Sequence, residues 1–422
     1  MKPSRFLALA AGFCALLACR QGEIGTPLGD TYERIARPVI WRTLPRGQAE
    51  SLGLKPGDVI LSYNDVPVRS NDDLLELEAQ LGQSGSAIPL TALRGDEELN
   101  LVVRPGELGY MPEADRYPSS LALALEDILS HFGVDVDYDW LAALSSESFT
   151  FTAEKTESPS RWPGGLSQTY LDDLARSVGL SLSDLYEPGE TDSAPAARGE
   201  QEKLTRAIHT ALNRGRTVLV RGGWPEPGRD DWGLVTRYDP DDSLLYGYSL
   251  GSAGELPLTG IILEAYETRH TRKPELQPGD MLTTVLVQAL EMGQAYSDTG
   301  WESGIAAYDL WITALDTIPF CPQCSTGSQA CFDRLVWTLR ANKESANRFL
   351  TDMRMALPDQ ASLIDEITAD NTAIIGKLDG IIQSGAKVGT RQDQQKLAMA
   401  VGEIEQIEAD LLSVYEDLIG EL

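Results

Sequence analysis

Three cysteines in the C-terminal third are the residues whose types and spacing most clearly allow chemistry. Cys321 and Cys324 are separated by two residues, as in redox-active pairs and zinc ligands, and Cys331 follows. A thioredoxin-like motif needs a strand-to-helix setting, and a structural zinc needs a fourth ligand nearby; this stretch offers neither. We therefore expect one disulfide within this cluster and one remaining thiol, in a loop between helices, with no metal and no cofactor.

Histidine chemistry is limited by number, because the chain holds only three histidines. His131 ends a predicted helix that begins near Ser120, about 16 Å away along the helix axis. His209 lies in a predicted helix before a strand, and His270 lies among basic residues. None has a nucleophile at motif spacing, so a general base is not evident.

The first residues predict a targeting signal. Lys2 and Arg5 precede an apolar stretch over 6–17, too short to span a bilayer comfortably, and Cys19 follows Leu-Leu-Ala. The segment resembles a bacterial lipoprotein signal, which implies removal of 1–18, lipidation of Cys19 and a short tether over 19–24. The alternative is an ordinary secretory signal with an incidental cysteine. Arg20 in place of Asp implies the outer membrane in the enterobacterial sorting rule, so we expect a lipid-anchored envelope protein facing the periplasm.

Composition describes an acidic, globular body. The chain has 422 residues, 42% of them hydrophobic, and 64 acidic against 35 basic residues give a net charge of −29. Neither nucleic acid nor anionic lipid headgroups attract such a charge, so the membrane contact must come from the lipid. No later stretch reaches the roughly 18 consecutive apolar residues that a membrane span requires.

The region 25–111 reads as short strands with one helix. Asn71 is the expected N-cap of a helix over 72–81, with Leu74, Leu81 and either Leu77 or Glu78 on its inner face. Turn residues separate the apolar stretches around it. We expect a small, partly open barrel with one capping helix and strands over 38–44, 59–63, 66–68, 88–93 and 99–103.

Within this region, residues 46–58, which include Leu-Gly-Leu-Lys-Pro-Gly-Asp at 52–58, resemble the PDZ domains of HtrA-type and site-2-type bacterial proteases. The closing stretch 104–109 fits as well. Such domains bind an extended peptide, often a free C-terminus, as an added strand between the helix and an edge strand. The resemblance implies a groove lined by Leu28 and Gly29, in the loop that holds a carboxylate, and by Leu74 and Glu78. The alternative is a PDZ fold that packs against its neighbour and binds nothing.

From residue 112 to 275 the pattern changes to helices followed by an antiparallel sheet. A helix over 121–133 follows two serines, and a Pro- and Gly-bearing loop is predicted over 187–199. Next come a predicted helix over 201–213 and strands over 217–221, 232–238 and 244–249.

That order of elements resembles papain-like peptidases of the bacteriocin-processing type and butirosin-H-like acyltransferases. Those families place a cysteine at the start of the first helix and a histidine at the start of the central strand. Here the positions carry Ser120, or Ser119, and 230–233. We expect Ser120 and Asp231 to be vestigial, in an inactive domain that acts as a scaffold or a peptide- or acyl-binding cleft. The alternative is an active peptidase, hydrolase or acyltransferase in which Ser120 is the nucleophile and an unrecognised base acts through Asp230 or Asp231.

The remainder, 276–422, is predicted to be a helical bundle. Apolar residues recur at steps of three and four from Leu397 to Leu422, and 363–382 supplies a matching partner helix. Residues 300–311 resemble the helix that follows the sheet in some papain-like proteins. The sequence thus predicts a multi-domain α+β protein that recognises a peptide or the C-terminus of a partner protein in the cell envelope.

Overall fold

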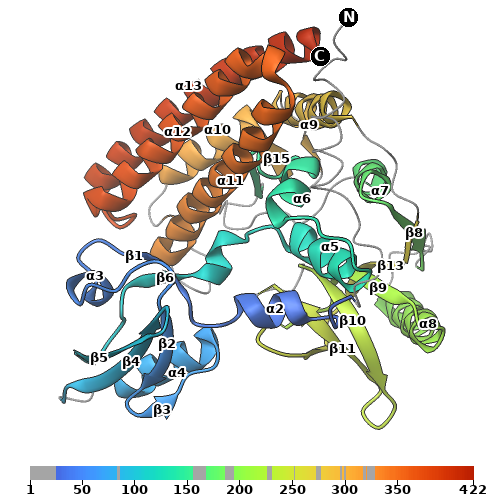
Figure 1. Cartoon of the computed structure of the whole chain (residues 1–422), viewed down its shortest axis with the longest axis horizontal. Helices are drawn as coiled ribbons and strands as arrows, with labels where there is room; N and C mark the ends of the chain where they lie inside the picture. Colours follow the sequence, from blue (N-terminus) through green and yellow to red (C-terminus); the bar gives the residue numbers. More distant parts are fainter. Residues whose placement is uncertain are drawn as a thin grey trace, which may run out of the picture. The chain divides into compact units, whose positions relative to one another are not determined.

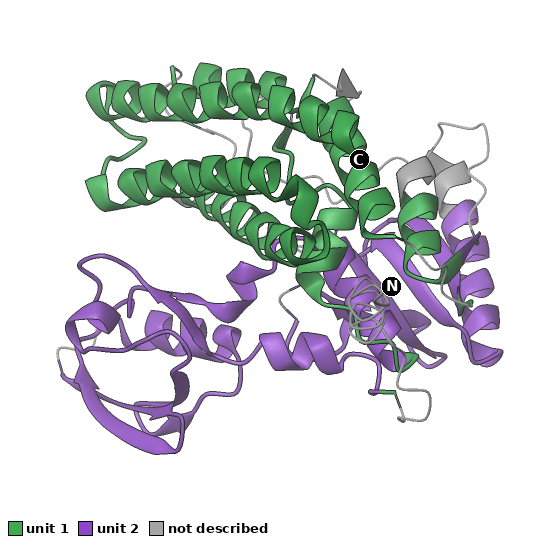
Figure 2. Cartoon of the chain, turned by 45° about the horizontal axis from the view of Figure 1, so that its top comes forward, with its two compact units in different colours: residues 1–25, 132–181, 270–422 green, residues 26–131, 182–269 purple. Residues whose placement is uncertain are grey.

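The computed structural model describes residues 25–82, 86–154, 168–185, 194–225, 231–250, 252–271, 277–294, 297–298, 301–316, 320 and 328–422. The protein is a mixed α+β chain, in which antiparallel sheets are followed by a C-terminal helical bundle (Figure 1). Its contacts divide it into two compact units, one containing Phe132–Ser181 and His270–Leu422 and the other Thr26–His131 and Leu182–Arg269 (Figure 2). The stretch 112–275, predicted as one domain, contributes to both units.

The N-terminal part of the second unit contains two small antiparallel sheets, ordered β3-β2-β4-β5 and β1-β6. The helix predicted over 72–81 is present, but its N-cap is Ser70 rather than Asn71. Ser70 accepts a hydrogen bond from the Asp73 amide while the Asp73 carboxylate accepts from that of Ser70, a capping box. The elements are β1 (Ile40–Thr43), α3 (Gln48–Ser51), β2 (Val59–Tyr63), β3 (Val66–Pro67), α4 (Asn71–Leu81), β4 (Ile88–Arg94), β5 (Glu97–Val103) and β6 (Tyr110–Pro112).

The turn between α3 and β2 is held by an ion pair. The Asp58 carboxylate accepts from Nε and Nη2 of Arg94 at 2.8 and 2.7 Å, and Nη2 also donates to the Gly53 carbonyl at 2.8 Å. Gly53 and Gly57 have φ of +72° and +88°, which favour glycine. Burial acts to raise the pKa of Asp58, but the hydrogen bonds from Arg94 and the Lys55 amide outweigh it and lower that pKa. This stretch is therefore a rigid, internally satisfied turn.

The rest of the second unit is a sheet with helices. The sheet has the order β12-β11-β10-β9-β13-β8, and the predicted strands over 217–221, 232–238 and 244–249 are confirmed. α8 begins at Ala194, inside the stretch predicted as a loop, because a proline in the first helical turn costs no hydrogen bond. The elements are α2 (Asp30–Ile35), η1 (Glu113–Arg116), α5 (Ser120–His131), β8 (Leu180–Asp184), α8 (Ala194–Asn213), β9 (Thr217–Gly222), β10 (Trp232–Asp239), β11 (Leu244–Ser249), β12 (Leu256–Leu258) and β13 (Ile262–His270).

The first unit is mainly helical, and its long helices form the bundle. The apolar stripe of the last helix is buried from Leu397 to Leu418, whereas Leu422, the last residue of the predicted stripe, is exposed. In the described part of the chain, no helix is long and apolar enough to cross a membrane. The elements are α6 (Tyr138–Leu144), β7 (Thr152–Glu154), α7 (Gln168–Ser177), α9 (Pro278–Gly293), β14 (Ser297–Asp298), β15 (Trp301–Ser303), α10 (Ile305–Leu315), α11 (Ser328–Ala356), η2 (Pro358–Gln360), α12 (Ala361–Ser384) and α13 (Arg391–Glu421).

Two details of this unit refine the sequence predictions. The helix predicted within 300–311 begins only at Ile305, because Trp301–Ser303 pairs with β7 as a strand. Gly304, at φ +59°, makes the turn between them, and an added Cβ would lie 2.1 Å from the Gly293 carbonyl oxygen. Cys331, on α11, is disulfide-bonded. Cys19, Cys321 and Cys324 lie outside the described residues.

Candidate functional site

β6 offers the edge of a sheet. It pairs antiparallel with β1, with Arg42 opposite Met111 and Thr43 opposite Tyr110, and it ends the β1-β6 order. Among the described strands, none occupies its second edge. A strand edge of this kind can accept an extended chain as an additional strand.

One face of α4 runs along the segment that leads into β6. Asn71 and Glu78, seven residues apart and so on the same face, both reach this segment. The Tyr110 hydroxyl donates to Asn71 Oδ1 at 3.1 Å, and the Leu108 amide donates to Glu78 Oε1 at 2.9 Å. Leu75 lies between them on that face and is 60% exposed. An uncovered apolar side chain therefore stands between two polar contacts that tie the helix to residues 108–110.

Glu78 is a buried carboxylate that accepts a main-chain hydrogen bond. Its side chain is 7% exposed. Burial raises its pKa to about 7; the Leu108 amide lowers it and the charge of Glu107 raises it further. In the described part of the chain, no lysine or arginine forms an ion pair with it. A buried acid of this kind changes charge close to neutral pH.

The residues predicted to line a peptide groove do not meet on one surface. Leu74 is fully buried in the core of the small domain. The Gly29 amide donates to the Asp127 carboxylate of α5 at 2.7 Å, and an added Cβ would lie 2.3 Å from the Tyr248 ring. Leu28 is only half-buried beside it. The structure thus places this Leu-Gly pair against α5.

A second Leu-Gly pair, Leu108 and Gly109, is the one that lies at α4. Sequence reasoning missed it, together with Asn71 and Leu75. The signals were present: the same Leu-Gly dipeptide at the end of the domain, and the spacing of 71, 75 and 78 on one helical face.

The structure does bring together the two positions compared with a catalytic dyad. Ser120 Oγ accepts a hydrogen bond from the Trp232 amide at 3.0 Å, and their exposed fractions are 3% and 0%. Asp231 precedes this tryptophan, and its main-chain oxygen accepts from the Gly222 amide and from Trp224 Nε1. Ser120 is thus an interior hydroxyl that ties a helix to a strand.

The three histidines have other contacts. His131 Nδ1 lies 3.0 Å from the Thr26 carbonyl oxygen, His209 Nε2 lies 2.8 Å from Asn213 Nδ2, and the His270 ring stacks on Phe132. All three histidines lie within the described residues, and none of these contacts involves Ser120. Within the same described residues, no group of histidine, cysteine and carboxylate side chains is placed to hold a metal.

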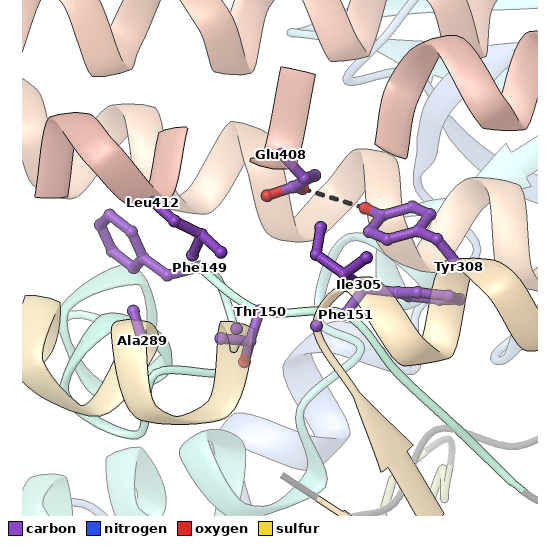
Figure 3. Close-up of a pocket in the computed structure, with 10 residues that line it drawn as sticks. Phe149, Thr150, Phe151, Ala289, Ile305, Tyr308, Glu408 and Leu412 are labelled. Carbon is purple, nitrogen blue, oxygen red and sulfur yellow. Dashed lines mark hydrogen bonds between the residues drawn. The ribbon is translucent and has the colours of Figure 1, made fainter. Parts of the chain in front are cut away.

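A further polar cluster lies inside the helical unit. Lys343 Nζ is 2.6 Å from Glu408 Oε1. The Tyr308 hydroxyl donates to the same oxygen at 2.9 Å (Figure 3). Lys343 also donates to the Phe149 carbonyl at 3.4 Å. The adjoining cavity is about 10 Å³, close to the space of one water. This cluster has no room for a ligand and acts as an interior ion pair.

No protein-family model matches this chain, and no curated protein is significantly similar to it in sequence. The functional argument therefore depends on the surface formed by Asn71, Leu75 and Glu78 of α4 with residues 108–112, which we name the α4–β6 groove after the peptide site that the PDZ resemblance implies.

Proposed function

We propose that this chain is a lipid-anchored cell-envelope protein that binds extended peptide segments in the α4–β6 groove. The observation that carries the proposal is the position of Leu75. It is exposed to solvent, yet its neighbours on the same helical face are bonded to the strand segment beside it. A peptide added to the free edge of β6 would cover this side chain and gain main-chain hydrogen bonds.

The sequence resemblance to PDZ domains supports the same function. A helix beside an available strand edge is the arrangement that this resemblance implies. The turn that carries its most specific residues is fixed by Arg94 and Asp58, so it forms a rigid support and is not itself a binding loop. Gly53 and Gly57 in that turn adopt positive φ angles, so they are explained by the backbone conformation of the turn.

The papain-like resemblance supports a scaffold in place of a second activity. A serine nucleophile needs a base that accepts its proton. Ser120 instead accepts a hydrogen bond from a main-chain amide in the interior. Replacement by alanine should therefore leave any hydrolytic background of the purified protein unchanged, and labelling of Ser120 by a serine-reactive probe would contradict this.

The anchor is part of the proposal. Lipidated Cys19 would hold the acidic body at a membrane, and Cys19→Ser should move the protein from the membrane fraction to the soluble one. A protein that stays in the membrane fraction after this change would contradict anchoring through Cys19.

Peptide binding is tested with the soluble Cys19→Ser chain lacking residues 1–18, and pools of randomised decapeptides in fluorescence anisotropy. Leu75→Asp should lower affinity at least about tenfold, because it places a charge where an apolar contact is expected. Val102→Asp is the matched control, since Val102 is 64% exposed on β5, the other sheet edge of the domain. Equal loss in both variants, or no binding at all, would contradict the proposal.

A further inference from the structure

The loop that enters β6 already holds a carboxylate. Its Leu108 amide donates to Glu78, which lies at the same end of the α4–β6 groove. Gly106 and Gly109 have φ of +115° and +73°, conformations that favour glycine. An added Cβ on Gly109 would lie 2.9 Å from the Gly47 Cα. The conformation of the loop thus directs the Leu108 amide toward α4, where the Glu78 side chain accepts its hydrogen bond.

Two acidic side chains, Glu78 and Glu107, lie near this point. Glu107, next to the loop amide, is exposed, and its charge acts on Glu78. Among the described residues, no cation pairs with Glu78. A ligand's terminal carboxylate would approach two acids and lose its main-chain donor to one of them. A lysine or arginine side chain would instead find the missing counter-charge.

We propose that Glu78 sets the ligand class of the groove, selecting an extended segment that places a lysine or arginine at the 106–110 loop over a free C-terminal carboxylate. The inference rests on the proposed function, because it assumes that a peptide enters the α4–β6 groove. Glu78 would then determine ligand specificity, and it also holds the 106–110 loop by accepting the hydrogen bond of the Leu108 amide.

The test uses three matched pools of randomised decapeptides: one with free carboxylates, one with C-terminal amides, and one with amides and lysine as the last residue. Wild type should bind the lysine pool at least about tenfold more tightly than the free-acid pool, since each tenfold step corresponds to one modest charge interaction. Glu78→Gln keeps an oxygen for the Leu108 amide and removes the charge. It should reduce the preference below about threefold.

Glu107→Gln is a second variant on an exposed side chain, where folding is not at risk. It should reduce the preference by a smaller factor than Glu78→Gln. Tighter binding of the free-acid pool by wild type, or an unchanged preference in Glu78→Gln, overturns the inference. The proposed peptide binding then still stands if Leu75→Asp lowers the affinity at least about tenfold. Binding that ignores Leu75→Asp, or the absence of binding to all pools, overturns the proposed function itself.

Discussion

Glu78 and Glu408 are both buried carboxylates, yet the chain treats them differently. In the helical bundle, Glu408 receives a lysine and a tyrosine hydroxyl, both from the interior. In the α4–β6 groove, Glu78 receives one main-chain amide. The small domain can supply a cation to an interior acid, since Asp58 is paired with Arg94. The comparison teaches that the chain pairs some interior acids with a cation, whereas Glu78 accepts a main-chain amide, as does Asp127 of α5, which accepts from the Gly29 and Thr31 amides.

The largest effect is expected in the bundle. Lys343→Met leaves Glu408 buried without its cation, which should lower the free energy of unfolding by about 3–5 kcal/mol in urea denaturation. Replacing both partners, as Lys343→Met with Glu408→Leu, should recover most of that loss. Lys377→Met is the control, because Lys377 forms an exposed pair with Glu403 in the same bundle. If Lys343→Met and Lys377→Met lowered the free energy of unfolding by similar amounts, the buried Lys343–Glu408 pair would not be special, and its contrast with Glu78 would be lost.

Asp58→Asn should have the next largest effect. It weakens the bonds from Arg94 and the Lys55 amide, at a cost of about 2 kcal/mol at pH 7. Because the folded-state pKa of Asp58 is lowered, the stabilisation is present above its ordinary value of 3.8 and is lost as the pH falls through the folded-state pKa. Thermal unfolding at pH 7 and pH 3 measures this. Asp96→Asn, at an exposed turn in the same domain, should change neither value. A deficit that persists undiminished at pH 3 would show that the ion pair is not its source.

Glu78→Gln should act in the opposite direction. The folded-state pKa is raised from 4.5 to about 7, so the wild type is most stable below pH 4.5 and loses stability as the pH rises through 7. The neutral variant should therefore exceed wild type by about 1–2 kcal/mol at pH 8 and match it at pH 4. Thermal unfolding across this range is the measurement. A variant that is less stable than wild type at pH 8 would mean that the Glu78 charge is compensated after all.

The smallest effect on stability is expected at Leu75. Its side chain is exposed, so Leu75→Asp should change the unfolding free energy by less than about 0.5 kcal/mol. The same change should lower the affinity for peptide at least about tenfold, which separates a ligand contact from a structural one. A large loss of stability would instead place Leu75 in the core of the domain.

Much of the fold could be predicted because its signals are local. The helix predicted over 72–81, three strands of the larger sheet (β9, β10 and β11) and the apolar stripe of α13 follow from periodicity and caps. The strand Trp301–Ser303 could not be predicted, because it exists only through pairing with β7, far away in the sequence.

The groove was harder to predict than the fold. Leu74 and Leu75 are adjacent and chemically identical, and a rotation of 100° about the helix axis decides which one is buried. Two Leu-Gly pairs occur in the domain, and only tertiary contacts show that Leu108 and Gly109, not Leu28 and Gly29, meet α4. The order of elements compared Ser120 and residues 230–233 with a catalytic pair, but it predicted neither the hydrogen bond from the Trp232 amide to Ser120 nor the burial of both residues.

Hydrogen exchange of the main-chain amides, with and without the tightest decapeptide from the pools, tests strand addition most directly. Binding in the α4–β6 groove should slow exchange at Tyr110 and Met111 of β6, which gains a partner, and leave residues 97–103 of β5 unchanged. Protection confined to β5, or unaltered exchange in both segments at saturating peptide, would contradict the account.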